Sequence, residues 1–267
     1  MHPTSPFTIR TVDVSRYILP LREGGSLPAL VEASDGFYYV LKFRGAGQGI
    51  NVLVAELLVG EVARALGLRV PELVFCELAE AFGRTEPDEE IQDLLRASTG
   101  LNLGLHFLRG ANTFDPLVTK VSAEEASLVV WLDCFTLNVD RTARNTNLLV
   151  WHQELWLIDH GAALYVHHTG PDWASSSKPR VFPQVRDHVL LPWASELAAA
   201  DTLAHQRLTP PVLQRIVDLL PDDWLEKADA TRPPAAQRQA YYHFLSARLA
   251  ASATFVAEAN AARRALI

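Results

Sequence analysis

Residues 138–161 read NVDRTARNTNLLVWHQELWLIDHG, and the remainder of the chain can be interpreted around them. Their pattern predicts a polar loop, a short apolar strand, a tight turn near Gln153 and a second apolar strand that ends at an aspartate. Because the strands of a hairpin run antiparallel, Asn145 and Asp159 are predicted to lie at its open end, with Asp140 just ahead of them. Two carboxylates and a carboxamide are hard oxygen ligands and proton acceptors, which suit Mg²⁺ and phosphoryl transfer.

The composition is typical of a globular protein without a strongly basic surface. The 267 residues include 24 Lys and Arg against 31 Asp and Glu, which gives a net charge of −7. No basic block occurs, so we do not expect a general nucleic-acid surface or a surface for anionic membranes. At this length, one large domain and two lobes are both possible.

The sequence also bears on the location of the protein. Cys76 and Cys134 each lie in an apolar run, which indicates buried thiols in a reducing compartment. The first residues lack the pattern of a signal peptide, and the longest apolar stretches are interrupted by charge within about ten residues. We therefore expect a cytoplasmic protein that does not enter a membrane.

Residues 8–43 have the pattern of strands and turns, and one lysine in them needs an explanation. The segment Phe37–Phe43 is rich in strand formers and carries Lys42 on the same face as Tyr38 and Val40. A lysine in such a strand is either exposed at a sheet edge or buried beside an anionic partner. Taken by itself, the exposed position is the commoner one for lysine.

A helix is predicted over Asn51–Leu66, with a stop signal in the glycine that follows. Its apolar stripe repeats at intervals of three and four residues, and Glu56 borders that stripe. A carboxylate in this position is costly unless it is paired, and Lys42 is the nearest candidate in the sequence. Glu61 lies on the opposite flank of the helix, where we expect it to be solvated.

Three glycines, Gly45, Gly47 and Gly49, separate this strand from this helix. A dinucleotide-binding fingerprint would need its third glycine at position 50, which is isoleucine, and no alternating βαβ pattern follows. We therefore interpret the glycine run as a flexible connection.

The second half of the chain is predicted to be mainly helical. Ser122 begins a helix with a capping box, and a long alanine-rich helix is predicted over residues 235–264. The residues from Arg109 to Asn112 suit a hinge between two lobes. His167 and His168 lack the spacing of a zinc site, so they are interpreted as part of a solvated loop.

The order of these elements and four of their residues resemble a protein-kinase-like fold. Lys42 resembles the lysine of the third strand, and Glu56 resembles its partner in the following helix. Asp140 with Asn145 five residues later is similar to a catalytic loop, and Asp159-His160-Gly161 is similar to the metal-binding Asp-Phe-Gly turn. In their sequences, these motifs most resemble those of the HipA-like kinase family, which is related in motif to the phosphatidylinositol kinases.

The resemblance implies an α+β, bilobal architecture. A small N-terminal lobe of antiparallel sheet plus the helix at 51–66 would occupy residues 1–110. A larger, mainly helical C-terminal lobe would occupy residues 111–267, with the catalytic loop, the metal-binding hairpin and the helical tail. The activity implied is that of an ATP- and Mg²⁺-dependent serine/threonine protein kinase.

The resemblance also implies a role for each site residue. Lys42 would hold nucleotide phosphates and Glu56 would orient it, while Asn145 and Asp159 would bind Mg²⁺ and Asp140 would accept the proton of the attacking hydroxyl. The nucleotide-binding set is completed by the hinge arginine and by a glycine turn that would cover the phosphates: Arg109, Gly24, Gly25 and Ser26.

Three positions depart from the family pattern and leave the acceptor open. Thr142 replaces a histidine of the relatives, Val139 replaces the arginine of protein kinases, and His160 replaces phenylalanine. Arg141 or Arg144 would supply the missing positive charge near the transferred phosphate. Two alternatives remain: a small-molecule or lipid-headgroup kinase, and a nucleotide-binding pseudokinase that acts on a partner protein. Retention of the lysine and of the metal-binding aspartate argues against the pseudokinase.

Overall fold

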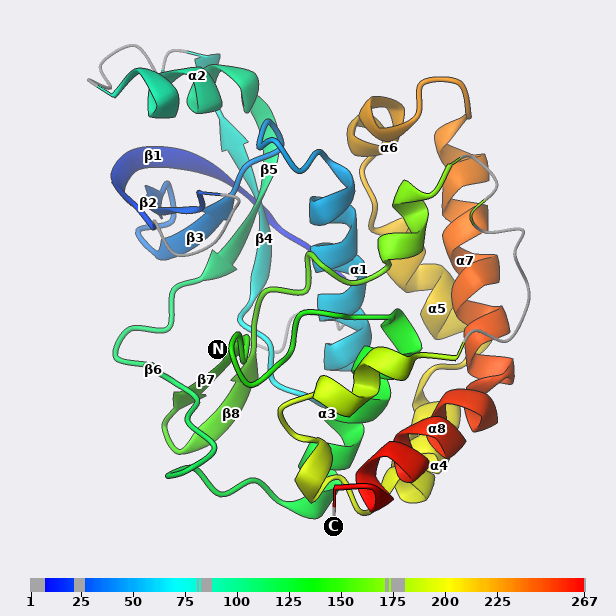
Figure 1. Ribbon diagram of the computed structural model, residues 1–267. Helices are drawn as coiled ribbons and strands as arrows, with labels where there is room; N and C mark the ends of the chain where they lie inside the picture. Colours follow the sequence, from blue (N-terminus) through cyan, green and yellow to red (C-terminus); the bar gives the residue numbers. More distant parts are fainter. Residues whose placement is uncertain are drawn as a thin grey trace.

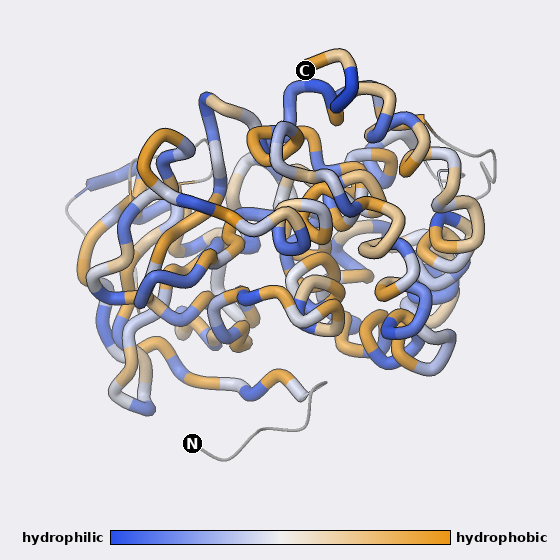
Figure 2. Tube along the Cα trace, turned by 90° about the horizontal axis from the view of Figure 1, so that it is seen from below, coloured by the Kyte–Doolittle hydropathy of each residue, from blue (hydrophilic) through white to orange (hydrophobic). Residues whose placement is uncertain are grey.

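A computed structural model describes residues 8–21, 27–80, 82, 88–170, 173 and 181–266 of the chain. The predicted phosphate-covering turn at Gly24, Gly25 and Ser26 lies outside the described residues. The molecule consists of a β-barrel on one side and a group of helices on the other, with helix α1 between them (Figure 1). Hydrophobic residues, orange in Figure 2, occur throughout both parts.

Five strands form a closed barrel in the order β1-β2-β3-β5-β4. Neighbouring strands are antiparallel except for β1 and β4, which run parallel and close the sheet. The prediction of a purely antiparallel sheet is therefore wrong at this one pair. Closure leaves no free edge, and alternate residues such as Val31 and Leu41 fill the interior. The strands are β1 (Thr11–Pro20), β2 (Ala29–Ala33), β3 (Tyr38–Lys42), β4 (Leu73–Leu78) and β5 (Gly100–His106).

Helix α1 (Asn51–Ala65) is the predicted helix, to within one residue. It contacts β5 of the barrel and also the helices α3 (Ala123–Thr136), α5 (Pro210–Asp218) and α6 (Asp222–Ala228). Residues 53–63 are therefore buried around its whole circumference. The expectation that Glu61 is solvated is therefore wrong, since only 2% of this residue is exposed. Helix packing on both flanks, which periodicity does not reveal, buries it.

A short helix, α2 (Glu89–Ala97), packs its apolar residues against one end of the barrel. Asp88 caps it, because its Oδ1 accepts hydrogen bonds from the backbone N–H groups of Glu90 and Ile91 at 3.0 and 3.4 Å. The acidic first turn thus serves the helix itself.

The helical part is built around α3 (Ala123–Thr136), whose N-terminus is capped by Ser122 as predicted. The predicted single helix over residues 235–264 is wrong, because the chain breaks at Ala251 into two helices. The break lets α7 pack on α5 while α8 turns to pack on α3 and α4. The remaining helices are α4 (Leu197–Arg207), α5 (Pro210–Asp218), α6 (Asp222–Ala228), α7 (Pro234–Ala250) and α8 (Ser252–Arg264).

The predicted hairpin is present and lies below the barrel in the view of Figure 1. It comprises β7 (Leu148–Trp151) and β8 (Glu154–Leu157), with β6 (Asn112–Thr113) paired to its outer edge. Its two-residue turn, His152-Gln153, has φ angles of 50° and 65°, the left-handed pair that suits the twist of a hairpin.

Both cysteines are free and buried, as predicted. Among the described helices, none is both long and apolar enough to cross a membrane. Short 3-10 segments follow the hairpin at Tyr165–His168, Pro183–Asp187 and Leu191–Trp193.

Candidate active site

Lys42 is at the centre of the site. Its Nζ lies 2.7 Å from Glu56 Oε2 on α1 and 2.5 Å from Asp159 Oδ1 beyond β8, and the residue is 7% exposed. The exposed placement that lysine usually prefers is therefore wrong here, and the paired placement is correct. Burial alone would lower the pKa of Lys42, but the negative charges of Glu56 and Asp159 raise it above the ordinary value. The lysine is thus a fixed cation between two carboxylates.

Glu56 is wholly buried and divides its carboxylate between two partners. Oε2 accepts from Lys42, while Oε1 lies 3.4 Å from Nδ1 of His160. Burial would raise the pKa of Glu56, but Lys42 and His160 together hold it at about 2. The group therefore remains an anion at neutral pH.

Asp159 follows β8 with a left-handed backbone, φ 56°, which is uncommon for a residue other than glycine. About 48% of its side chain is exposed, although one oxygen pairs with Lys42. Asp159 thus combines a fixed position with access from solvent. We call residues 159–161 the metal turn, after the role that the resemblance implies for them.

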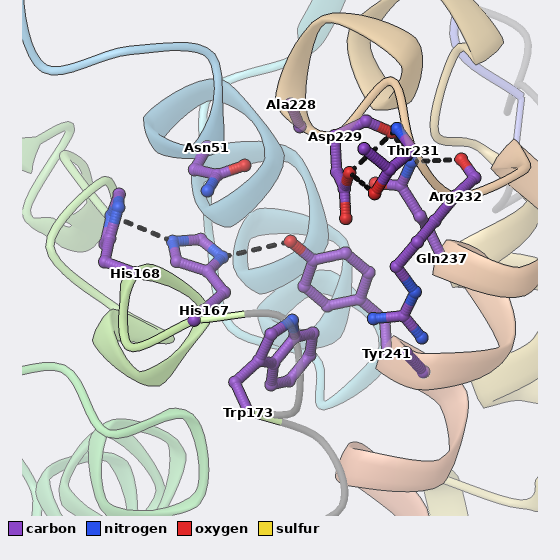
Figure 3. A pocket seen from close by; sticks show the side chains of 12 residues that line it. Asn51, His167, His168, Trp173, Ala228, Asp229, Thr231, Arg232, Gln237 and Tyr241 are labelled. Atoms are coloured by element: carbon purple, nitrogen blue, oxygen red, sulfur yellow. Dashed lines mark hydrogen bonds between the residues drawn. The ribbon is translucent and has the colours of Figure 1, made fainter.

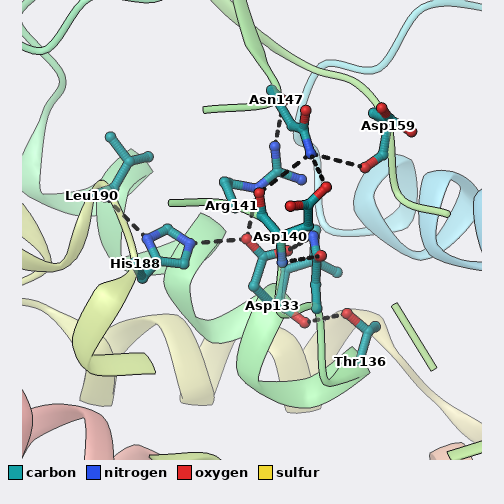
Figure 4. A network of polar contacts seen from close by, with 10 residues as sticks. Asp133, Thr136, Asp140, Arg141, Asn147, Asp159, His188 and Leu190 are labelled. Atoms are coloured by element: carbon teal, nitrogen blue, oxygen red, sulfur yellow. Dashed lines mark hydrogen bonds and ion pairs between the residues drawn. The ribbon is translucent and has the colours of Figure 1, made fainter. Parts of the chain in front are cut away.

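Asp140 and two asparagines lie together, as Figure 4 shows for Asp140 and Asn147. Asn145 donates from Nδ2 to Asp140 Oδ2 at 2.8 Å, and Asn147 approaches the same oxygen at 3.3 Å. Asn147 Nδ2 also lies 3.5 Å from the carbonyl oxygen of Asp159. Asn147 therefore connects Asp140 to Asp159, while Asn145, the predicted metal ligand, is exposed beside Asp140.

Asn147 is a site residue that the sequence interpretation missed. It is 8% exposed and has a left-handed backbone, φ 48°. Its position directly before the first hairpin strand was an available signal, because asparagine tolerates this conformation better than most residues.

Beneath the loop lies a buried polar network centred on Asp133 of α3 (Figure 4). Asp133 Oδ2 accepts from Arg141 Nε at 2.6 Å and lies 2.8 Å from His188 Nε2, while Oδ1 accepts from Asn138 at 2.9 Å. Arg141 also donates to the carbonyl of Asn147. Burial would raise the pKa of Asp133, but Arg141 and His188 lower it.

This network corrects one expectation and adds a second missed group. Arg141 is 1% exposed and holds the loop from below, so it does not supply a positive charge to the transferred phosphate. Of the two arginines, only Arg144 is exposed. A carboxylate in the apolar run around Asp133 was an available signal, since buried carboxylates need partners.

Arg109 does not join the lysine and carboxylates. It is exposed, and it borders a cavity of about 400 Å³ with Leu30, Tyr38 and Phe107. Leu30 pairs with Val40, and Val40 shares a strand face with Lys42 because strand residues alternate. The cavity thus opens on the sheet face that also carries Lys42.

The expected solvated position is wrong for His167, which is buried in a short 3-10 turn, whereas His168 is exposed. His167 is 6% exposed and lies between Tyr241 and His168, with its ring nitrogens 3.0 Å from Tyr241 Oη and 3.1 Å from His168 Nε2 (Figure 3). Burial, with a smaller effect of His168, lowers the pKa of His167 to about 3. Within the described residues, no group of three or more His, Cys, Asp or Glu side chains could hold a metal ion.

The chain is similar to known proteins both in its sequence pattern and in its fold. The family model described as HipA-like kinase matches residues 14–254. A search of curated proteins gave no match. Among solved structures, the Helicobacter pylori proinflammatory kinase CtkA is similar at a TM-score of 0.56 and 12% identity, over 97% of this chain and 99% of that one. At this identity the likeness shows the fold, whereas the family model covers most of the sequence. The chain therefore belongs to the HipA-like kinase family.

Proposed function

We propose that the chain is an ATP- and Mg²⁺-dependent phosphotransferase that phosphorylates serine or threonine hydroxyls of a protein. The observation that supports it most is the bridge Glu56–Lys42–Asp159, which joins a helix, a strand and the metal turn through one buried cation. A buried ion pair is weak evidence for stability, so a functional reason for retaining it is favoured. We also propose that residues 1–110 and 111–267 act as two lobes around this bridge.

The oxygen donors at the site fit Mg²⁺. Magnesium is bound in such sites by one or two protein carboxylates together with substrate phosphates and water, so a cluster of three acidic ligands is not required. The half-exposed carboxylate of Asp159 would be one ligand, and the side-chain oxygen of Asn145 or Asn147 another. Bound Mg²⁺ would neutralise the charge that develops on the phosphate oxygens.

Asp140 would accept the proton of the attacking hydroxyl. It is half-buried, and two asparagine amides donate to its Oδ2 and fix the orientation of the carboxylate. The Asp133 network holds the loop from below, so Asp140 sits on a rigid support. Fixed geometry of this kind is what a general base requires.

The nucleotide would extend along β3. The cavity at Leu30, Tyr38 and Phe107 would take the base, and Lys42, four residues from Tyr38 or about 13 Å along the strand, would take the phosphates. Arg109 would contact the nucleotide at the rim of the cavity. The turn at residues 24–26 would cover the phosphates, as the resemblance implies.

Calorimetric titration with ATP and Mg²⁺ tests the binding half of the proposal. We expect wild type and Asp140→Asn to bind the nucleotide with similar affinity, because Asp140 would contact the acceptor hydroxyl and not the nucleotide. Asp159→Asn should lose the magnesium-dependent part of the affinity. A wild-type protein that does not bind ATP with Mg²⁺ would contradict the assignment.

A further inference from the structure

The residue after the metal-turn aspartate makes a polar contact that the proposed roles do not use. His160 is wholly buried, and its Nδ1 lies 3.4 Å from Glu56 Oε1, the oxygen that Lys42 does not occupy. Glu56 is thereby held from two sides, by the strand lysine and by the metal turn.

The surroundings of the ring fix its proton. Its Nε2 is buried and has no hydrogen-bond partner among the described residues. Burying an N–H group without a hydrogen-bond partner costs more free energy than burying a ring nitrogen that carries no proton, which argues against a proton on Nε2. A carboxylate only accepts hydrogen bonds, so the nitrogen that faces Glu56 must be the donor. The geometry therefore places a proton on Nδ1 of His160, which donates it to Glu56.

The metal turn and α1 are packed too closely for this contact to be incidental. A Cβ at Gly161 would lie 2.6 Å from Cγ1 of Val52 on α1, a distance that side chains do not tolerate. Asp159 before the ring has a left-handed backbone, which directs its own carboxylate toward Lys42 while the ring enters the interior. One turn of chain thus contacts both partners of the central ion pair.

We propose that His160 is a positioning residue for nucleotide binding: by donating to Glu56 it holds that carboxylate, and through it Lys42, in the geometry that receives the phosphates. This inference rests on the proposed function. It also gives a role to the histidine that stands where other kinases have phenylalanine, because a hydrogen bond replaces ring packing as the link between α1 and the metal turn.

Two variants distinguish a positioning role of His160 from a role in which its ring only fills space. His160→Asn places an amide N–H near the former Nδ1 but leaves a void, whereas His160→Phe fills the volume and removes the donor. A hydrogen bond to a charged group implies about a tenfold loss of kcat/KM for ATP in His160→Phe, mainly as a raised KM. His160→Asn should stay within about threefold of wild type for the same reason.

A structural role predicts the opposite order, since activity would follow stability and the phenylalanine variant would be the more stable one. Wild-type kcat/KM in His160→Phe, or an equal loss in both variants, would overturn the proposal. His243→Phe, on the exposed side of α7, is the matched control and should leave the kinetics unchanged.

Nitrogen-15 NMR of the histidine rings gives a readout that does not depend on catalysis. The signal assigned to His160 by its loss in His160→Phe should show the Nδ1–H tautomer, and a proton on Nε2 would overturn the hydrogen bond to Glu56. If wild type shows this tautomer but transfers no phosphate to any acceptor, the proposed function fails and the kinetic role of His160 fails with it. If wild type is active and the tautomer is wrong, only the positioning role fails.

Discussion

At the scale of single residues, Lys42 connects the most distant parts of the site. Its two carboxylate partners come from α1 and from the chain beyond the hairpin, 14 and 117 residues away in the sequence. Removal of Lys42 would leave the buried carboxylate of Glu56 without its cation, whereas removal of either carboxylate leaves Lys42 paired with the other one.

Replacement of Lys42 by methionine should therefore affect both stability and binding. The buried Glu56 would lose its cation, and we expect a loss of about 3–5 kcal/mol in the free energy of unfolding. The double variant Lys42→Met/Glu56→Gln should recover most of the stability, because both buried charges are gone, but none of the ATP affinity. Urea unfolding and nucleotide titration of the three proteins measure this; full recovery of ATP binding in the double variant would contradict the role of Lys42.

The pKa of Glu56 leads to a prediction for pH. It is lowered from 4.5 to about 2 in the folded chain, so the unfolded chain binds the proton more readily. The stabilisation from Glu56 is then fully present above pH 4.5 and is lost as the pH falls toward 2. Urea unfolding of wild type and Glu56→Gln should show a stability difference that narrows over this interval, and a difference that widened would contradict the prediction.

At the scale of elements, the sequence predicted the helices and strands whose signals lie within the element itself. The helix α1 and the hairpin β7–β8 have clear periodicity and turn residues, and both are present. The break at Ala251 was not predictable, since no proline or glycine marks it and it follows from packing α8 on α3 and α4. Burial of Glu61 likewise depends on helices far along the chain.

The candidate site was predictable to a similar degree. Lys42 and Glu56 could be paired because strand alternation and the helical stripe each left one charge on an apolar face. Asn147 and Asp133 were missed because their roles depend on a left-handed backbone and on a tertiary network, which the resemblance to a motif does not contain.

The catalytic loop should depend on the helix beneath it. Asp133→Ala would leave the buried guanidinium of Arg141 without its carboxylate, and we expect a loss of about 3–5 kcal/mol in unfolding free energy. Asp187→Ala, at an exposed aspartate next to His188, is the control and should change stability by less than about 0.5 kcal/mol. Equal stability of the two variants would show that the network does not support the loop.

At the scale of the whole molecule, the barrel and the helical part meet at α1, and the site lies where they meet. Lys42 belongs to the barrel, Asp140 and Asp159 to the chain that leads into and out of the hairpin, and Glu56 to the helix between them. A nucleotide that contacts both parts should stabilise the folded chain as a unit.

Thermal unfolding should show whether the nucleotide stabilises the barrel and the helical part together. With ATP and Mg²⁺ at about 100 times the dissociation constant, mass action predicts about 2.7 kcal/mol of added stability in a single cooperative transition. Two separate transitions, of which only one moves with nucleotide, would show that the two parts do not share the ligand.

In the proposed mechanism, Asp140 accepts a proton during phosphate transfer from bound ATP. The most direct measurement is the rate of transfer from radiolabelled ATP, with Mg²⁺, to the chain itself and to a mixed library of serine and threonine peptides. We predict that wild type transfers phosphate and that Asp140→Asn, while still binding ATP, is slower by about a hundredfold or more. Equal rates in the two proteins would contradict this role of Asp140, and a wild type that binds ATP and never transfers phosphate would contradict the proposed kinase activity.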